Sequence, residues 1–147
     1  VALLDAGLAC TAAIACPGEM GASIHINGTN SSIIDTVFVC RSVVHSPQAG
    51  GGPVRDALET SVADDLSALR RGGVNPTAGD AKCIALGHLA RLAVADLASG
   101  WQPEAETGGK LSLVTHWLTT LGGAGVLADS LGRIARGIKG AAEGVAL

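Results

Sequence analysis

The 147-residue sequence is poor in aromatic side chains, with one Phe, two Trp and no Tyr. Proteins that bind single-stranded nucleic acid stack the bases on aromatic faces, so this scarcity argues against a stacking platform. Cationic residues are also few, because ten Lys and Arg stand against thirteen Asp and Glu, for a net charge of −3. A domain that binds phosphates by itself needs a clustered cationic excess, which the sequence does not show.

Familiar catalytic and cofactor motifs are absent as well. No G-x-G-x-x-G segment follows a predicted strand, and the four histidines form no H-E-x-x-H pattern. Gly108-Gly109-Lys110 matches only the end of a phosphate-binding loop, so we interpret it as a polar turn before a helix. His88 lies in an apolar helical segment, where a packed histidine is a more ordinary interpretation than a catalytic base.

Paired cysteines and long apolar runs are also missing. No C-x-x-C pair is present, which argues against a zinc ribbon. No signal peptide is visible and no apolar run of about 18 residues lacks a charge or a glycine, so we expect a cytoplasmic protein without a membrane partner. We therefore predict reduced, structural thiols at Cys10, Cys16, Cys40 and Cys83.

The sequence does contain enough apolar material for a core, since 48% of its residues are hydrophobic. Its first part, residues 1–44, begins with a helix end over 2–8, closed by Gly7. A short strand is predicted over 9–16, followed by a long connection from Pro17 to Asn30. The β-branched run over 31–41 predicts a second strand. Within it, Asp35 either faces solvent or has a buried partner.

Residues 45–53 form a predicted linker rich in Gly and Pro, and residues 54–147 form a helical region of about four helices. Apolar residues recur every three or four positions from Val54 to Leu69, which predicts an amphipathic helix. A second helix after Asn75-Pro76 is apolar almost all round and is predicted to be the buried centre. Further helices are predicted over 111–121 and from about 126 onward.

This order of elements predicts an α/β fold in which the first part is incomplete. Two strands do not make an independently stable sheet, so we expect their neighbours to lie upstream of Val1. The chain then resembles a piece of a longer protein.

Several stretches, in order, are similar to the C-terminal end of adenine-specific DNA methylases that carry a zinc-ribbon insertion and an N-terminal domain of unknown function. The stretches that carry the resemblance are Leu3-Leu-Asp-Ala-Gly-Leu8, Pro17-Gly-Glu-Met20, Gly28-Thr-Asn-Ser-Ser-Ile33, Val37-Phe-Val-Cys-Arg41 and Asp80-Ala-Lys-Cys-Ile-Ala-Leu-Gly-His-Leu-Ala-Arg-Leu-Ala93, followed by Trp101 and Trp117. The resemblance implies the last helix, sixth strand and antiparallel seventh strand of a Rossmann-like methyltransferase sheet, followed by a helical tail.

The resemblance also implies a function for the parent protein, which is methyl transfer from S-adenosylmethionine to adenine in DNA. The family's glycine-rich cofactor loop, D-P-P-Y motif and zinc-ribbon cysteines do not occur here. We therefore expect this segment to be inactive alone, to bind no S-adenosylmethionine, and to act with DNA and the missing N-terminal part as partners.

Two groups of residues are candidates for contact with DNA. The resemblance places near the target pocket Glu19, Asn30, Ser31 and Ser32. Five cations on the predicted helices could touch phosphate, or could simply be solvated on helix surfaces. They are Arg70, Arg71, Arg133, Arg136 and Lys139. The alternative function is a helical protein-interaction module, or a decayed remnant without catalysis, in which apolar helix faces from Val54 onward would dock a partner.

Overall fold

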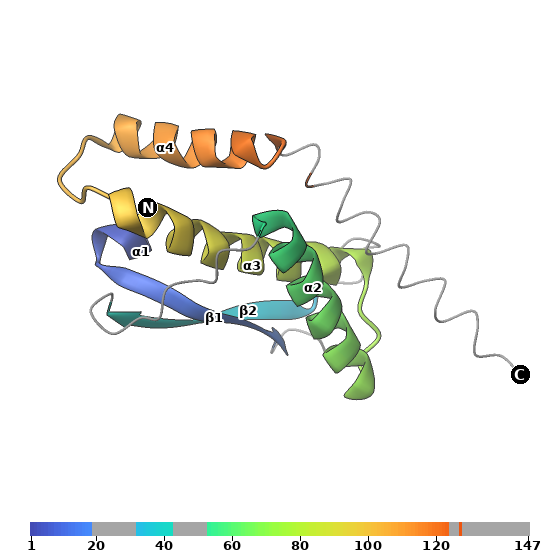
Figure 1. Ribbon diagram of the computed structural model, residues 1–147. Coiled ribbons are helices and arrows are strands. Elements are labelled where there is room, and N and C mark those ends of the chain that lie inside the picture. The colour runs from blue at the N-terminus through green and yellow to red at the C-terminus, as the bar shows by residue number, and fades with distance from the viewer. Residues whose placement is uncertain (19–31, 43–52, 124–126, 128–147) are drawn as a thin grey trace, which may run out of the picture.

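The computed structural model describes residues 1–18, 32–42, 53–123 and 127 (Figure 1). These residues form a mixed α/β fold, in which helices pack on a two-stranded antiparallel sheet. The elements in chain order are α1 (Ala2–Asp5), β1 (Leu8–Pro17), β2 (Ile34–Ser42), α2 (Val54–Arg71), α3 (Ala78–Leu97), the 3-10 helix η4 (Ala98–Gly100) and α4 (Thr107–Thr120).

The two predicted strands are confirmed, and they pair with each other. The register runs from Leu8 opposite Ser42 to Pro17 opposite Ile34, with a shift between Cys10 and Ala12. A shift of this kind is a β-bulge, in which one extra residue of a strand is left unpaired and the side chains beyond it change face.

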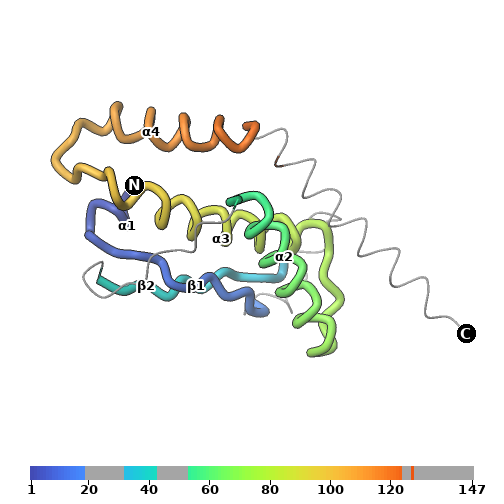
Figure 2. The backbone as a smooth tube through the Cα atoms, in the orientation of Figure 1, coloured from blue at the N-terminus to red at the C-terminus, as the bar shows by residue number. Residues whose placement is uncertain are grey.

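Helix α3 is the centre of the fold, as its apolar composition predicted. It covers one face of the sheet, α2 crosses beside it, and α4 runs along its side away from the sheet (Figures 1 and 2). The amphipathic helix predicted from residue 54 is α2, and its buried stripe joins that of α3 in one core. The buried members of this core are Ile34, Leu58, Val62, Leu66, Leu69, Ala81, Ile84, Ala85, Leu92, Trp117 and Leu127.

Helix α3 approaches the sheet closely at a glycine. A Cβ atom at Gly87 would lie 2.6 Å from Cγ2 of Thr36 on β2. Real Cβ contacts are not this short, so the absence of a side chain at position 87 sets how near α3 lies to β2.

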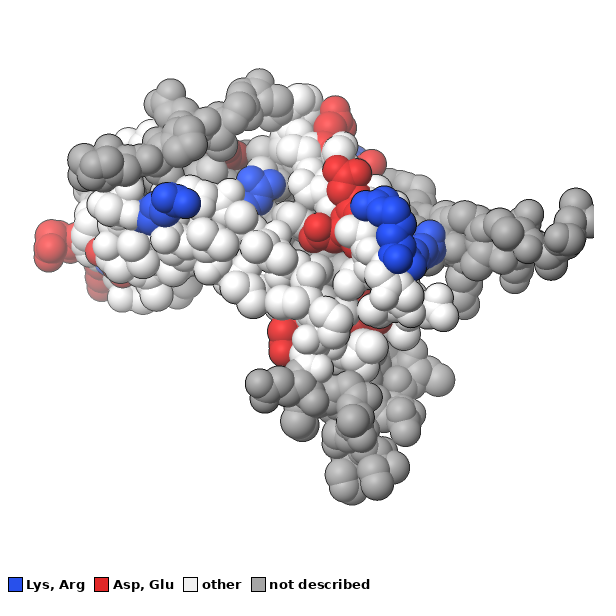
Figure 3. All heavy atoms as spheres, turned by 90° about the horizontal axis from the view of Figure 1, so that it is seen from below, with Lys and Arg blue, Asp and Glu red and all other residues white. Residues whose placement is uncertain are grey.

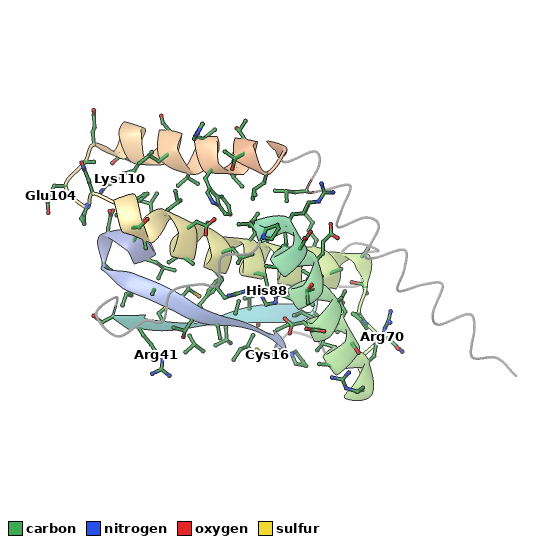
Figure 4. All side chains as sticks on the ribbon, viewed as in Figure 1. Cys16, Arg41, Arg70, His88, Glu104 and Lys110 are labelled. Atoms are coloured by element: carbon green, nitrogen blue, oxygen red, sulfur yellow. The ribbon has the colours of Figure 1, made fainter. Side chains whose placement is uncertain are left out.

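The sheet face opposite α3 is not covered by the described residues. Because side chains alternate along a strand, Thr36 faces α3 whereas Asp35 and Val37 face away. Asp35 is exposed, which decides between the two environments considered for it. Ile14 and Val37, which lie opposite each other, are each 49% exposed, and Arg41 also points away from the helices (Figure 4).

The segment Gly108-Gly109-Lys110 corrects one prediction. These residues form part of the first turns of α4, which begins at Thr107, and not a turn before the helix. Glycine is a poor helix former, which is why the sequence favoured a turn. The buried Lys110 side chain bonds the carbonyl of Pro103 and pairs with Asp5, and these distant contacts hold the segment in place.

By length and composition alone, one described helix, Ala78–Gly100, is long and apolar enough to cross a membrane. The sequence analysis did not predict a membrane span there, because charged residues and a glycine interrupt the apolar run. The core helix of a soluble protein can meet the same criteria, and α3 contributes buried side chains to the core described above. Residues 45–52 of the predicted linker 45–53 lie outside the described residues, and so does the helix predicted from 126, apart from Leu127.

Candidate functional site

Ser32 is the only candidate target-pocket residue within the described part of the chain, since Glu19, Asn30 and Ser31 lie outside it. Its hydroxyl donates a hydrogen bond to Oδ1 of Asp80, at 2.9 Å, and the backbone N–H of Ile33 donates to the same oxygen, also at 2.9 Å. The start of β2 is thereby attached to the first turn of α3. We call the group formed by Ser32, Ile33, Thr77 and Asp80 the Asp80 clasp.

The other half of the clasp is the N-terminal cap of α3. Thr77 is the N-cap residue, and its hydroxyl accepts a hydrogen bond from the backbone N–H of Asp80 at 3.2 Å. In return, Oδ2 of Asp80 accepts from the backbone N–H of Thr77 at 2.7 Å and from its hydroxyl at 2.9 Å. This reciprocal pattern is a capping box, with Asp in the position more often held by Glu.

Asp80 is completely buried, with 0% of its surface exposed. Burial raises the pKa of its carboxyl, but the hydrogen bonds from Thr77, Ser32 and Ile33 together outweigh burial and hold the pKa below its ordinary value. The carboxylate is therefore charged at neutral pH and its two oxygens are occupied. It is suited to holding two elements together and not to exchanging a proton with a substrate.

The clasp lies where both ends of segment 19–31 join the sheet. The backbone N–H of Gly18, at the end of β1, donates to the carbonyl of Ile33 at 2.8 Å. A Cβ atom at Gly18 would lie 2.6 Å from Oδ2 of Asp35. The residues on either side of segment 19–31 thus lie close together beside the N-terminus of α3. The other three candidate residues belong to that segment.

A second polar group ties α2 to α3. Nε2 of His88 lies 2.8 Å from Oδ2 of Asp65, and the His88 side chain is almost fully buried between the helices (Figure 4). A carboxylate beside an imidazole can orient a general base, but a base must reach a proton of its substrate. Nδ1 of His88 is buried and has no hydrogen-bond partner among the described residues. His88 is a packed histidine, in agreement with the sequence interpretation.

The candidate phosphate contacts are only in part within the described chain. Arg70 and Arg71 lie in the last turn of α2, where a positive charge interacts favourably with the helix dipole. Nη1 of Arg71 also donates to the hydroxyl of Ser67 at 2.8 Å. In the view from below, Lys and Arg lie scattered among uncharged residues or beside Asp and Glu (Figure 3). Arg133, Arg136 and Lys139 lie outside the described residues.

A third polar group was missed by the sequence analysis. Oδ1 of Asp5 in α1 accepts from Nε1 of Trp101 at 2.9 Å and lies 2.8 Å from Nζ of Lys110 in α4. The hydrogen bonds from Lys110 and Trp101 lower the pKa of Asp5 below its ordinary value. These partners are 96 or more positions apart in the chain, so no local sequence pattern could have identified them.

Neither of the carboxylates Asp80 and Asp65, which are buried and half-buried, is free to bind a ligand. Asp80, the fully buried carboxylate, is occupied by this chain's own donors, and Asp65 is bonded to His88. Within the same residues, no group of three or more His, Cys, Asp or Glu side chains could hold a metal ion. Comparisons of the chain with protein-family models, with curated proteins and with solved structures found no match.

Proposed function

We propose that this chain is the C-terminal part of an S-adenosylmethionine-dependent DNA adenine methyltransferase, inactive without the upstream part that would carry the cofactor and target-base motifs. The observation that carries the proposal is the antiparallel pair β1–β2, covered by α3 on one face and exposing Ile14 and Val37 on the other. This arrangement is what the edge of a larger sheet would present once its remaining strands and helices are removed.

The physics of sheets supports the same proposal. A two-stranded sheet is marginal by itself, and within the described residues the second edge of β2 pairs with no other strand. Unpaired edges and apolar faces on such a strand favour association with further strands. Upstream strands of a Rossmann-like sheet would pair with that edge, and their helices would cover Ile14 and Val37.

In the proposed enzyme, the residues of this chain position and do not react. The Asp80 clasp holds Ser32 and Ile33, which follow segment 19–31, and the hydrogen bond from Gly18 to Ile33 holds the residue that precedes it. The resemblance places this segment at the target pocket beside the flipped adenine. Ser32, whose hydroxyl donates to Asp80 and accepts from the Ile34 backbone N–H, is a positioning residue at the base of that segment. S-adenosylmethionine would supply the methyl group, held by the upstream part.

The test is S-adenosylmethionine binding by isothermal titration calorimetry, carried out on this chain and on a chain extended upstream through the complete sheet. We expect binding by the extended protein only. Binding by the short chain would overturn the assignment of the cofactor site to the upstream part. Binding by neither protein would overturn the proposed function.

A helical interaction module is the second candidate, because α4 leaves Leu111 and Leu113 about half exposed. Exposed apolar side chains on a helix can contribute to a surface that docks a partner. The DNA sequence upstream of the codon for Val1 discriminates between the candidates. A reading frame that encodes a glycine-rich loop and a D-P-P-Y motif would favour the methyltransferase, whereas a start codon near Val1 would favour the module.

A further inference from the structure

Two cysteines lie directly opposite each other on the paired strands. Cys10 of β1 and Cys40 of β2 are partners in the strand register. Directly opposite residues of antiparallel strands have Cα atoms about 4.5–5.5 Å apart, which falls within the range of about 4.4–6.8 Å found in disulfides. The pairing of the strands thus already supplies the spacing that a disulfide requires.

The β-bulge is what brings the two cysteines together. Ala12 and Ile14 are opposite Val39 and Val37 on the uncovered face, so strict alternation would place Cys10 on that face as well. The register shift between Cys10 and Ala12 turns Cys10 to the face that carries α3, opposite Cys40.

The surroundings of the pair keep the two side chains together. Cys10 is buried with Leu4 and Val94, and Cys40 is partly buried against the same cluster. The Cys10 thiol donates to the carbonyl of Ala12 at 3.3 Å. Burial, followed by the neighbouring Cys40, raises the pKa of Cys10, so its thiol is protonated at neutral pH.

We propose that Cys10 and Cys40 form a dithiol site that a small-molecule disulfide, such as glutathione disulfide, converts into a cross-strand disulfide. Both cysteines are free thiols in the structure, so the disulfide is a second covalent state of the sheet. The proposal is independent of the methyltransferase assignment, because it rests only on the pairing of β1 with β2.

The reaction is two successive thiol–disulfide exchanges. The Cys40 thiolate, on the more exposed of the two side chains, attacks one sulfur of glutathione disulfide, forms a mixed disulfide and releases one glutathione thiolate. Cys10 then loses its proton to that thiolate or to solvent and attacks the Cys40 sulfur, which releases the second glutathione. The protein loses two protons and two electrons, and one glutathione disulfide is reduced to two glutathione molecules.

The other two cysteines provide an internal comparison. Cys16 is opposite Asp35 in the register, and Cys83 on α3 donates to the carbonyl of Ile34 at 3.2 Å. Neither of them faces a cysteine across the sheet. Exchange should therefore be confined to Cys10 and Cys40 and should not scramble among all four thiols.

The experiment is equilibration of the full chain in glutathione buffers of increasing disulfide content, followed by acid quench, alkylation and peptide mass spectrometry. We expect two of the four thiols to be lost together, a protein two hydrogen atoms lighter, and a linked peptide that joins Cys10 to Cys40. Four alkylated thiols at the highest disulfide content, a stable glutathione adduct on Cys40, or a link to Cys16 or Cys83 would each overturn the proposal.

Matched variants sharpen the result. Cys16→Ser should still lose two thiols, and Cys40→Ser should lose none to an intramolecular link. Because Cys40→Ser could also disturb the sheet, its circular dichroism is compared with that of Cys16→Ser. Peptide mapping of the unmodified chain needs no variant and decides the proposal even if Cys40→Ser does not fold.

Discussion

Replacing Asp80 by Asn tests whether the Asp80 clasp stabilises the fold through its charge. The substitution keeps the shape of the side chain but removes the charge and replaces one acceptor oxygen by an NH2 group. That group would then face either the Thr77 donors or those of Ser32 and Ile33, all of which now donate to the carboxylate. At least one buried backbone N–H would therefore lose its acceptor, and the remaining hydrogen bonds would lose their charged partner.

The expected magnitude follows from those losses. A hydrogen bond to a charged group contributes about 1.5–3 kcal/mol, and a stranded buried donor costs about 1–3 kcal/mol. Because these effects overlap, we expect Asp80→Asn to lower the free energy of unfolding by about 3 kcal/mol. The measurement is urea unfolding followed by circular dichroism at pH 7, with the exposed Asp64→Asn on α2 as the matched control. A loss below about 0.5 kcal/mol, the usual size for a surface substitution, would refute the reasoning.

The pH dependence supplies an independent test. The folded-state pKa of Asp80 is lower than its value in the unfolded chain, so its charge stabilises the folded state above about pH 4, the ordinary pKa of Asp. This contribution is lost as the pH falls through the lowered folded-state pKa. The difference in stability between the unmodified chain and Asp80→Asn should thus shrink toward acid pH. A difference that stays constant from pH 6 to pH 3 would contradict a role for the charge.

Two further substitutions test the packing around α3. Gly87→Ala should destabilise the fold by about 1–2 kcal/mol, because overpacking against Thr36 outweighs the helix propensity gained. Combining it with Thr36→Ala should relieve the loss. Gly100→Ala should change stability little, because the space around Gly100 is open. Urea unfolding of Gly87→Ala, Thr36→Ala, their combination and Gly100→Ala checks this, and an additive double variant would contradict it. Trp117→Phe removes the hydrogen bond from Nε1 to Asp96 at 3.0 Å and should cost about 1–2 kcal/mol; an unchanged unfolding midpoint would contradict a role for this bond in holding α4 on α3.

Local patterns in the sequence were sufficient to predict that both strands and the helices α1 to α4 are present, although not where each of them begins and ends. The apolar spacing of α2 from Val54 and the apolar composition of α3 are recorded in consecutive residues, so their existence and their buried faces could be read directly. The β-branched run of β2 and the Pro-Gly end of β1 are equally local. Rossmann-like membership and the methyltransferase function stay predictions, since they concern strands and motifs outside this sequence.

The polar contacts were decided only by tertiary structure. Ser32 was chosen by resemblance, but its partner Asp80 lies 48 positions away, and Asp5 meets Trp101 across 96 positions. A local pattern specifies which face of an element is apolar, but it does not specify which distant donor meets which acceptor. The first turns of α4 were wrongly predicted for this reason, because glycine propensity is local whereas the contacts of Lys110 are not.

The pairing of Cys10 with Cys40 shows the same division. The missing C-x-x-C pair and targeting segment predicted reduced thiols, and the four cysteines are free in the structure. The identity of the facing pair depends on the strand register and on one bulge, and a shift of register by one residue would turn Cys10 to the opposite face of the sheet. The sequence by itself determined the elements and their apolar faces, whereas the tertiary structure decided which polar and sulfur atoms meet, because those contacts depend on register and packing between distant segments.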